Sequence, residues 1–179
     1  MQLFARSLLV AISVIVVGSV MWFAWQQGAA SAAVQLTFNA RCRPIQGTIH
    51  SVFVSQNCTS PVGLCTAGTI TGAGPLDGAT AFLALSVAPS AGLAGIEPPA
   101  NLSYSGELTV TASGGTLITR DLGVLDAAHL AFTEMERPES GTGVFANPGS
   151  SVFFISGSIV DNGNGFQGNL SGSICANDN

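Results

Sequence analysis

Two neighbouring segments of the chain carry acidic side chains within otherwise apolar sequence. Arg120 and Asp121 interrupt the apolar run 117–125, and Glu134 and Glu136 follow on the next segment. A carboxyl group that is buried beside a cavity has a raised pKa, so it can act as an acid, a base or an anchor for a ligand. Asp121 and Glu134 are therefore the candidate catalytic residues.

A structural ion pair is the alternative explanation for the same charges. If the turn between the two segments places Val124 opposite Phe132, then Arg120 faces Glu136. The register shifted by one residue would place Asp121 opposite Glu134, and this pairing of like charges costs free energy. We therefore prefer the first register, in which a cross-strand pair near a barrel mouth contributes little to stability.

Aromatic residues join the charged ones in the candidate ligand-binding site. Tyr104 is the only tyrosine, and it lies on the apolar face of an alternating segment. Its hydroxyl needs a hydrogen-bond partner, which could be a neighbouring side chain or a ligand. The expected ligand-binding residues are Tyr104, Arg120, Phe132, Glu136 and Phe166.

The sequence offers little support for other kinds of active site. His50 and His129 are expected on the surface, and the chain contains no lysine and no Gly-x-Ser-x-Gly elbow. The turn 161–165 lacks the closing glutamate of a calcium loop, so we read it as a hairpin turn. The cysteine spacing does not suit zinc. We expect no metal and no cofactor.

The first 33 residues are typical of export. Arg6 precedes an apolar stretch from residue 8 to 25, and small residues at 30–33 suit cleavage after Ala32 or Ala33. The stretch is also just long enough to span a bilayer, so a retained membrane anchor is the alternative to a cleaved signal peptide. Either interpretation places one domain, residues 34–179, outside the cytoplasm. The membrane would be a partner only through residues 8–25 of an uncleaved segment.

Charge and cysteine content agree with that location. Residues 34–179 carry ten acidic and four basic side chains, so binding to nucleic acid is not expected. Four cysteines in an oxidising compartment predict two disulfides, with three connectivities open. We favour Cys58–Cys65, which closes a short loop, and Cys42–Cys175, which ties the two ends of the domain together.

Short segments of strand character follow one another through the domain. Residues 102–110 and 166–174 alternate apolar and polar side chains, and Gly, Pro, Asn and Asp separate the segments. The predicted fold is all-β, an eight-stranded antiparallel up-and-down meander closed into a barrel and preceded by an N-terminal hydrophobic helix. The expected strands are 45–55, 66–71, 79–87, 102–111, 116–125, 130–137, 152–160 and 166–175, with a further uncertain strand near 34–38.

Two features of these strands bear on function. Gly106, Gly168 and Gly172 occupy inward positions, where they either leave a cavity or allow the strands to bend. The segment 151–159 is apolar on both faces. It is expected to lie either under the loop 88–100 or, slightly favoured, in the interface of a homo-oligomer.

One stretch resembles a known family. Gly141-Thr142-Gly143-Val144-Phe145, with Gly149 following, resembles a segment of allene oxide cyclase and dirigent-type barrels, although Pro148 departs from the pattern. The closing run 163–175 is similar to that of secreted bacterial relatives. The resemblance implies an eight-stranded barrel with an apolar cavity, no metal and often an oligomer. It assigns no catalytic residue in this chain.

Three functions follow from these observations. The first is non-catalytic binding of a small hydrophobic molecule by an exported barrel. The second is a cofactor-free cyclase or dirigent-type enzyme that acts on a hydrophobic substrate through Glu134 or Asp121. The third is a structural module of the cell envelope with a filled core.

The fate of the N-terminal segment is directly testable. We expect the exported protein to begin at Ala33 or Val34, because cleavage after Ala32 or Ala33 satisfies the small-residue rule of signal peptidase. N-terminal sequencing of the exported protein measures this. An intact Met1 would instead establish the retained anchor.

Overall fold

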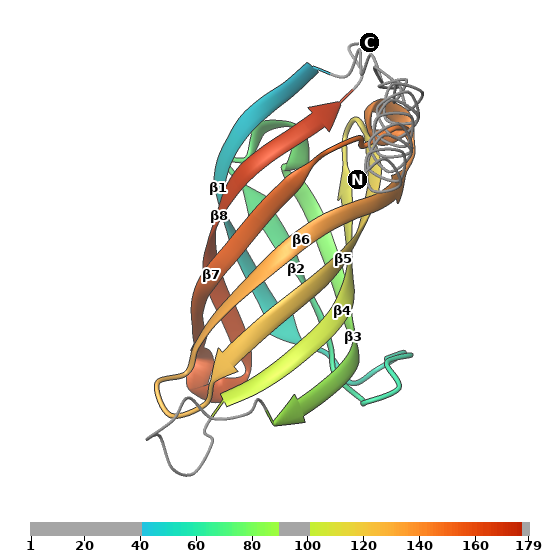
Figure 1. The fold of residues 1–179 in the computed structure, drawn as a ribbon. Helices are drawn as coiled ribbons and strands as arrows, with labels where there is room; N and C mark the ends of the chain where they lie inside the picture. The colour runs from blue at the N-terminus through green and yellow to red at the C-terminus, as the bar shows by residue number, and fades with distance from the viewer. Residues whose placement is uncertain (1–40, 90–100, 177–179) are drawn as a thin grey trace, which may run out of the picture. The chain divides into compact units, whose positions relative to one another are not determined.

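The protein is described by a computed structural model over residues 41–89 and 101–176. These residues form one closed barrel in which each strand pairs with the next, and the last pairs with the first (Figure 1). The strands are β1 (Arg41–Phe53), β2 (Cys65–Thr71), β3 (Gly78–Pro89), β4 (Asn101–Ala112), β5 (Gly115–Asp126), β6 (Ala131–Gly141), β7 (Val152–Val160) and β8 (Gly165–Ala176). The predicted eight-stranded antiparallel meander is confirmed.

Pairing of β1 with β8 closes the barrel. The two strands run antiparallel from Arg41 opposite Ala176 to Val52 opposite Gly165, and Cys42 faces Cys175 within this pair. Cys42 and Cys175 form a disulfide, and Cys58 and Cys65 form the second. Both predicted connectivities are confirmed. Two disulfides within the chain are compatible with a location outside the cytoplasm.

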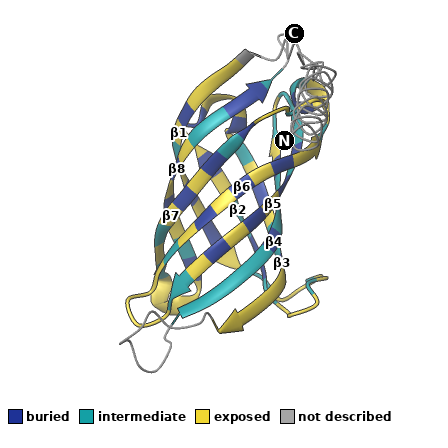
Figure 2. Ribbon diagram, in the orientation of Figure 1, coloured by how far each residue is buried: buried dark blue, intermediate teal, exposed yellow. Residues whose placement is uncertain are grey.

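Buried and exposed residues alternate along the strands, as Figure 2 shows for β5 to β8. In β4 and β8 the side chains that face inward are the predicted ones, the apolar and glycine positions at every second residue of 102–110 and 166–174. Each strand therefore has one solvent-exposed face and one face turned to the barrel interior, as expected for a small barrel.

Apolar side chains fill one half of the interior. Leu76, from the 3-10 turn η1 (Gly74–Leu76), and Phe145, from η2 (Gly143–Phe145), are both completely buried there. They pack against the inward side chains of the strands, among them Leu117 and Phe153. The segment 141–145, on which the family resemblance rests, thus contributes to this packed half of the barrel.

The outer face of β7 differs from the prediction of a strand buried on both sides. Phe153 and Ile155 are buried inside, but Phe154 points outward and is 48% exposed. It lies opposite Met135 of β6, which in turn lies opposite Leu122 of β5. Within one chain this row is open to solvent, because alternation turns every second side chain of a strand outward. The homo-oligomer stays a prediction.

Several expectations fall on residues outside those described. They are the signal peptide or anchor in residues 1–33, the hydrophobic helix, the uncertain strand near 34–38 and most of the loop 88–100. Within the described residues, no helix has the length and apolar character needed to cross a membrane.

The disulfide between the barrel's ends should dominate its covalent stabilisation. Replacing Cys42 and Cys175 by Ser should lower the free energy of unfolding by about 5 kcal/mol, because this bond closes a very long loop. The control pair, Cys58→Ser with Cys65→Ser, should lose about 2.5 kcal/mol. Denaturant unfolding measures both losses, and a larger loss from the control pair would refute this order.

Candidate functional site

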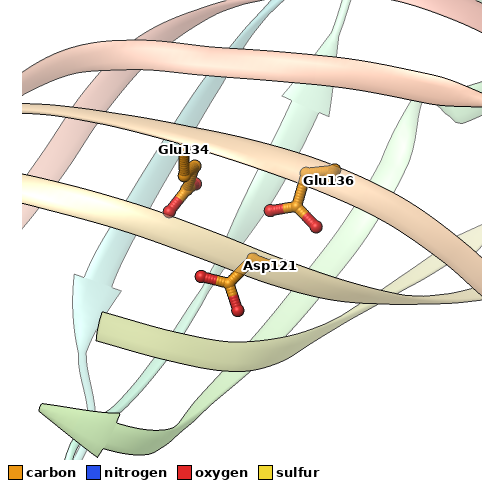
Figure 3. Close-up of side chains that lie close together, drawn as sticks. All are labelled: Asp121, Glu134 and Glu136. Carbon is orange, nitrogen blue, oxygen red and sulfur yellow. The ribbon is translucent and has the colours of Figure 1, made fainter. Parts of the chain in front are cut away.

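Two rows of side chains cross the inner surface of β4, β5 and β6. In the first row, Tyr104 lies opposite Gly123, and Gly123 lies opposite Glu134. In the second row, Gly106, Asp121 and Glu136 follow one another in the same way. Figure 3 shows Asp121 on β5 close to both glutamates, which come from β6. The regular pleat of three paired strands therefore brings the three carboxyl groups together.

The glycines in these rows make room for aromatic rings. A Cβ atom on Gly123 would lie 2.2 Å from the ring of Tyr104, and one on Gly106 would lie 2.3 Å from the ring of Phe82. Tyr104 extends across Gly123 and donates a hydrogen bond of 2.8 Å to Oε2 of Glu134. At Gly106 the freed space is thus occupied by a neighbouring ring, rather than being left as an empty cavity.

The three carboxyl groups form a compact buried cluster. One oxygen from each of Asp121, Glu134 and Glu136 lies within 4.8 Å of the others. Asp121 is 4% exposed, Glu134 8% and Glu136 not at all. Among the described residues, neither oxygen of Asp121 nor Oε1 of Glu136 has a hydrogen-bond partner. Burial with so few partners strongly disfavours the ionised form.

Burial accordingly raises the pKa of each carboxyl group. The pKa of Asp121 rises to about 7, mainly through loss of water. The backbone amides of Asp121 and Gly106 offset part of this rise, although neither makes a hydrogen bond of ordinary geometry. Burial raises the pKa of Glu134 to about 8, while the Tyr104 hydrogen bond lowers it and the charge of Asp121 adds to the rise. Burial and then the charge of Glu134 raise the pKa of Glu136 well above its usual range.

Thr119 gives independent support for a neutral Glu136. Its hydroxyl oxygen contacts Oε2 of Glu136 and lies 3.3 Å from the carbonyl oxygen of Leu108. A hydroxyl has one proton to donate, so Thr119 cannot donate to both oxygens. Both contacts are hydrogen bonds only if Glu136 carries a proton and donates it to Thr119, which donates in turn to Leu108.

The phenol of Tyr104 stays protonated in this setting. Burial raises its pKa well above the ordinary value, and the negative charge of Glu134 and the hydrogen bond to that group add to the rise. Tyr104 is therefore a hydrogen-bond donor at any physiological pH.

An apolar cavity of about 120 Å³ adjoins this cluster. Glu134 and Tyr104 are part of its wall, whereas Asp121 and Glu136 are not. The other lining residues are Ile49, Phe53, Leu64, Thr66, Phe82, Val87, Leu102, Leu108, Leu125, Phe132, Ile159 and Phe166. Most come from the strand ends at one rim of the barrel, where β4, β6 and β8 begin. Apolar walls with a few convergent polar groups are typical of small-molecule sites.

The structure divides the predicted site residues among the cavity wall, the row next to it and the outer surface of the barrel. Tyr104, Phe132, Phe166 and Glu134 line the cavity, and the rings of Phe132 and Phe166 meet edge to face with centroids 5.3 Å apart. Asp121 and Glu136 lie in the second row, next to Glu134.

Arg120 lies away from the cluster, on the outer face of β5. Its side chain is 43% exposed, and its guanidinium lies 3.0 Å from Glu139 and 3.5 Å from Glu107. The predicted pairing of Arg120 with Glu136 is therefore wrong.

The pairing register of β5 and β6 explains that error. Val124 lies opposite Thr133 rather than Phe132, and Asp121 faces Glu136. The connecting turn is one residue longer than assumed, because Asp126 accepts hydrogen bonds from the amides of Ala128 and His129, and Leu130 adopts a positive φ of 54°. A like-charge pair is tolerated across these strands because burial keeps its members protonated.

Sequence reasoning missed Thr119. It belongs to the inward row of β5 with Leu117, Asp121 and Gly123. Its spacing of two residues from Asp121 was the available signal, since side chains at i and i+2 share one face of a strand.

The same three carboxylates are also the one group in the described residues whose oxygens are spaced to hold a metal ion. Carboxylate oxygens suit hard cations such as Ca²⁺ or Mg²⁺. Nearby oxygens that could complete such a shell are the hydroxyls of Thr119 and Tyr104. The expectation of no metal stays a prediction.

No protein-family model, no curated protein and no solved structure matches the chain. The class defined by fold and site is a disulfide-bonded, closed β-barrel with an apolar cavity and buried carboxyl groups. Its function has to be inferred from that geometry.

The raised pKa values predict an unusual dependence of stability on pH. Folded Asp121 and Glu134 hold their protons up to about pH 7 and 8, while their ordinary pKa values are 3.8 and 4.5. Between these limits the folded state binds more protons than the unfolded state, so their contribution to stability falls as pH rises.

Glu134→Gln should therefore raise the free energy of unfolding relative to wild type by an amount that grows between about pH 4 and pH 8, reaching a few kcal/mol. The exposed Glu139→Gln is the control and should show no such trend. Denaturant unfolding across this range measures the difference, and a constant or shrinking effect of Glu134→Gln would refute the assignment.

Proposed function

We propose that this protein is an exported barrel that binds a small, mostly apolar molecule in its cavity. The observation that carries the proposal is the pairing of an apolar wall with one polar pair, Tyr104 and Glu134, on the same cavity surface. The phenol and the carboxyl group would fix the orientation of a polar group on the ligand, and Phe82, Phe132 and Phe166 would contact its apolar body.

Two further features agree with this proposal. Disulfides suit an oxidising compartment, and the N-terminal segment 1–33 suits a signal peptide or a membrane anchor. The resemblance of the segment 141–149 to allene oxide cyclase and dirigent-type barrels points to the same class, barrels whose cavity holds a hydrophobic molecule.

A purely structural envelope module is the weaker alternative. A core that served stability alone would gain from apolar side chains at the positions of Asp121 and Glu136, because buried carboxyl groups without partners destabilise a fold. The presence of three such groups beside a cavity favours a role in binding or catalysis.

Acid catalysis on the bound molecule is a second candidate, favoured by the state of Glu134. With a pKa of about 8, this group is a neutral acid at pH 7 and lies on the cavity wall. It could donate its proton to a ligand oxygen, such as that of an epoxide, as the C–O bond breaks and its electron pair passes to oxygen. Water would then add to the electron-deficient carbon and return a proton to the Glu134 carboxylate. Such general acid catalysis contributes about 10²–10⁴-fold to a rate.

Binding is tested by displacement of a neutral hydrophobic dye from the purified exported protein. We expect the dye to bind and Phe132→Ala with Phe166→Ala to weaken binding about 10-fold or more, because two aromatic contacts are lost. The control variant is Phe154→Ala, on the outer face, which should bind the dye as wild type does. Absence of dye binding by wild type would leave only the structural role.

Catalysis is tested with styrene oxide as an apolar epoxide probe. An enzyme should consume it about 10²-fold faster than its Glu134→Gln variant at pH 7, while the dye affinity of the two proteins stays equal. Equal rates would establish a binder without acid catalysis.

A further inference from the structure

We propose that the molecule held in the cavity carries a cationic amine, whose ammonium group lies at Glu134 with Asp121 and Glu136 directly behind it. The inference rests on the proposed function, since it names the chemical class of the ligand of that same cavity. Its apolar body would lie against the rings of Phe132 and Phe166.

The cluster has more hydrogen-bond acceptors than its neighbours can satisfy. Both oxygens of Asp121 and Oε1 of Glu136 are buried without a hydrogen-bond partner among the described residues. Asp121 is 96% buried, and it sits within 4.8 Å of an oxygen of Glu134, which reaches the cavity. An ammonium group has three donors and no acceptor, so it matches a site that offers acceptors in excess.

Among the residues described by the structure, no cation is seen on the inner side to balance the charge of the cluster. The chain contains no lysine. The positive charge that acts on Asp121 is that of Arg120, whose side chain points outward to Glu107 and Glu139. Buried carboxyl groups are ordinarily paired with a cation or bound to a metal ion. Here the cation would have to come with the ligand.

An amine with an apolar body fits the whole site better than a metal ion does. A metal ion held by the three carboxyl groups would leave the adjoining apolar cavity without a role. An amine with an apolar body occupies both halves of the site.

Charge balance then sets the protonation states. One ammonium group needs one ionised carboxylate, so one of the three groups releases its proton to solvent and the other two stay protonated. The titratable groups at the ligand head are Tyr104 from β4 and Glu134 from β6, with Asp121 from β5 and Glu136 from β6 directly behind Glu134. At pH 7 Asp121, with a pKa of about 7, is already about half ionised in the free protein, so binding of an amine should release about half a proton there and about one proton at pH 6. Binding of a neutral analogue should release none.

The experiment compares three probes of equal chain length, octylamine, octanol and octanoate, below their micelle-forming concentrations. Each displaces the neutral dye from the exported protein at pH 7, and calorimetry in buffers of different ionisation enthalpy counts the protons released. We expect octylamine to bind about 10-fold or more tightly than octanol, as for one charge-assisted hydrogen bond, and octanoate to bind weakest.

Two variants report on the cluster itself. Asp121→Asn with Glu134→Gln should bring the affinities for octylamine and octanol close together, while Glu139→Gln, an exposed acid of the same strand, should leave their ratio unchanged. Proton release by wild type is a readout that does not depend on the folding of any variant.

The outcomes separate this inference from the proposed function. If octanol binds as well as octylamine, the amine is wrong and the apolar binding site stands. If neither the dye nor any probe binds, the proposed function itself fails. If CaCl₂ or MgCl₂ binds and displaces octylamine, the cluster is a metal site and the inference is overturned.

Discussion

Loss of water around three carboxyl groups is the constraint on which the site depends. In an interior of low polarity the ionised forms of Asp121, Glu134 and Glu136 are disfavoured, and mutual repulsion of their charges adds to this. The barrel keeps these groups largely neutral and gives them few internal partners, the hydroxyls of Tyr104 and Thr119. The same condition makes Glu134 a proton donor at neutral pH and makes the cluster receptive to an incoming cation.

The rest of the molecule holds this unfavourable arrangement in place. Pairing of β1 with β8, locked by Cys42–Cys175, removes the free strand edges and encloses the interior. The packed half around Leu76 and Phe145 supplies the hydrophobic stabilisation, and the opposite half keeps a cavity. Gly123 is a further requirement, because only its missing side chain allows Tyr104 to reach Glu134 across the intervening strand. A stable shell can thus tolerate a destabilising centre, as functional sites often require.

Sequence reasoning was most successful where the evidence is local. The alternation in 102–110 and 166–174 predicted which residues face inward, and the cysteine positions predicted both disulfides. It placed Arg120 wrongly because register depends on turn geometry and on energetics that act across strands. The rule that like charges avoid one another rejected a register with Asp121 opposite Glu134. The observed register is shifted by one residue in the other direction and places Asp121 opposite Glu136, an arrangement that was not predicted. It is tolerated because burial keeps these groups protonated, which no local pattern reveals.

The protonation of the cluster is the claim most open to direct measurement. Carbon-13 NMR of the side-chain carboxyl groups, followed from pH 4 to pH 9 and assigned with the Asp121→Asn and Glu134→Gln variants, reports the pKa of each group in the folded protein. The account predicts titration of Asp121 near pH 7 and of Glu134 near pH 8, with Glu136 still protonated at neutral pH. Titration of all three groups near pH 4, as for exposed acids, would contradict it.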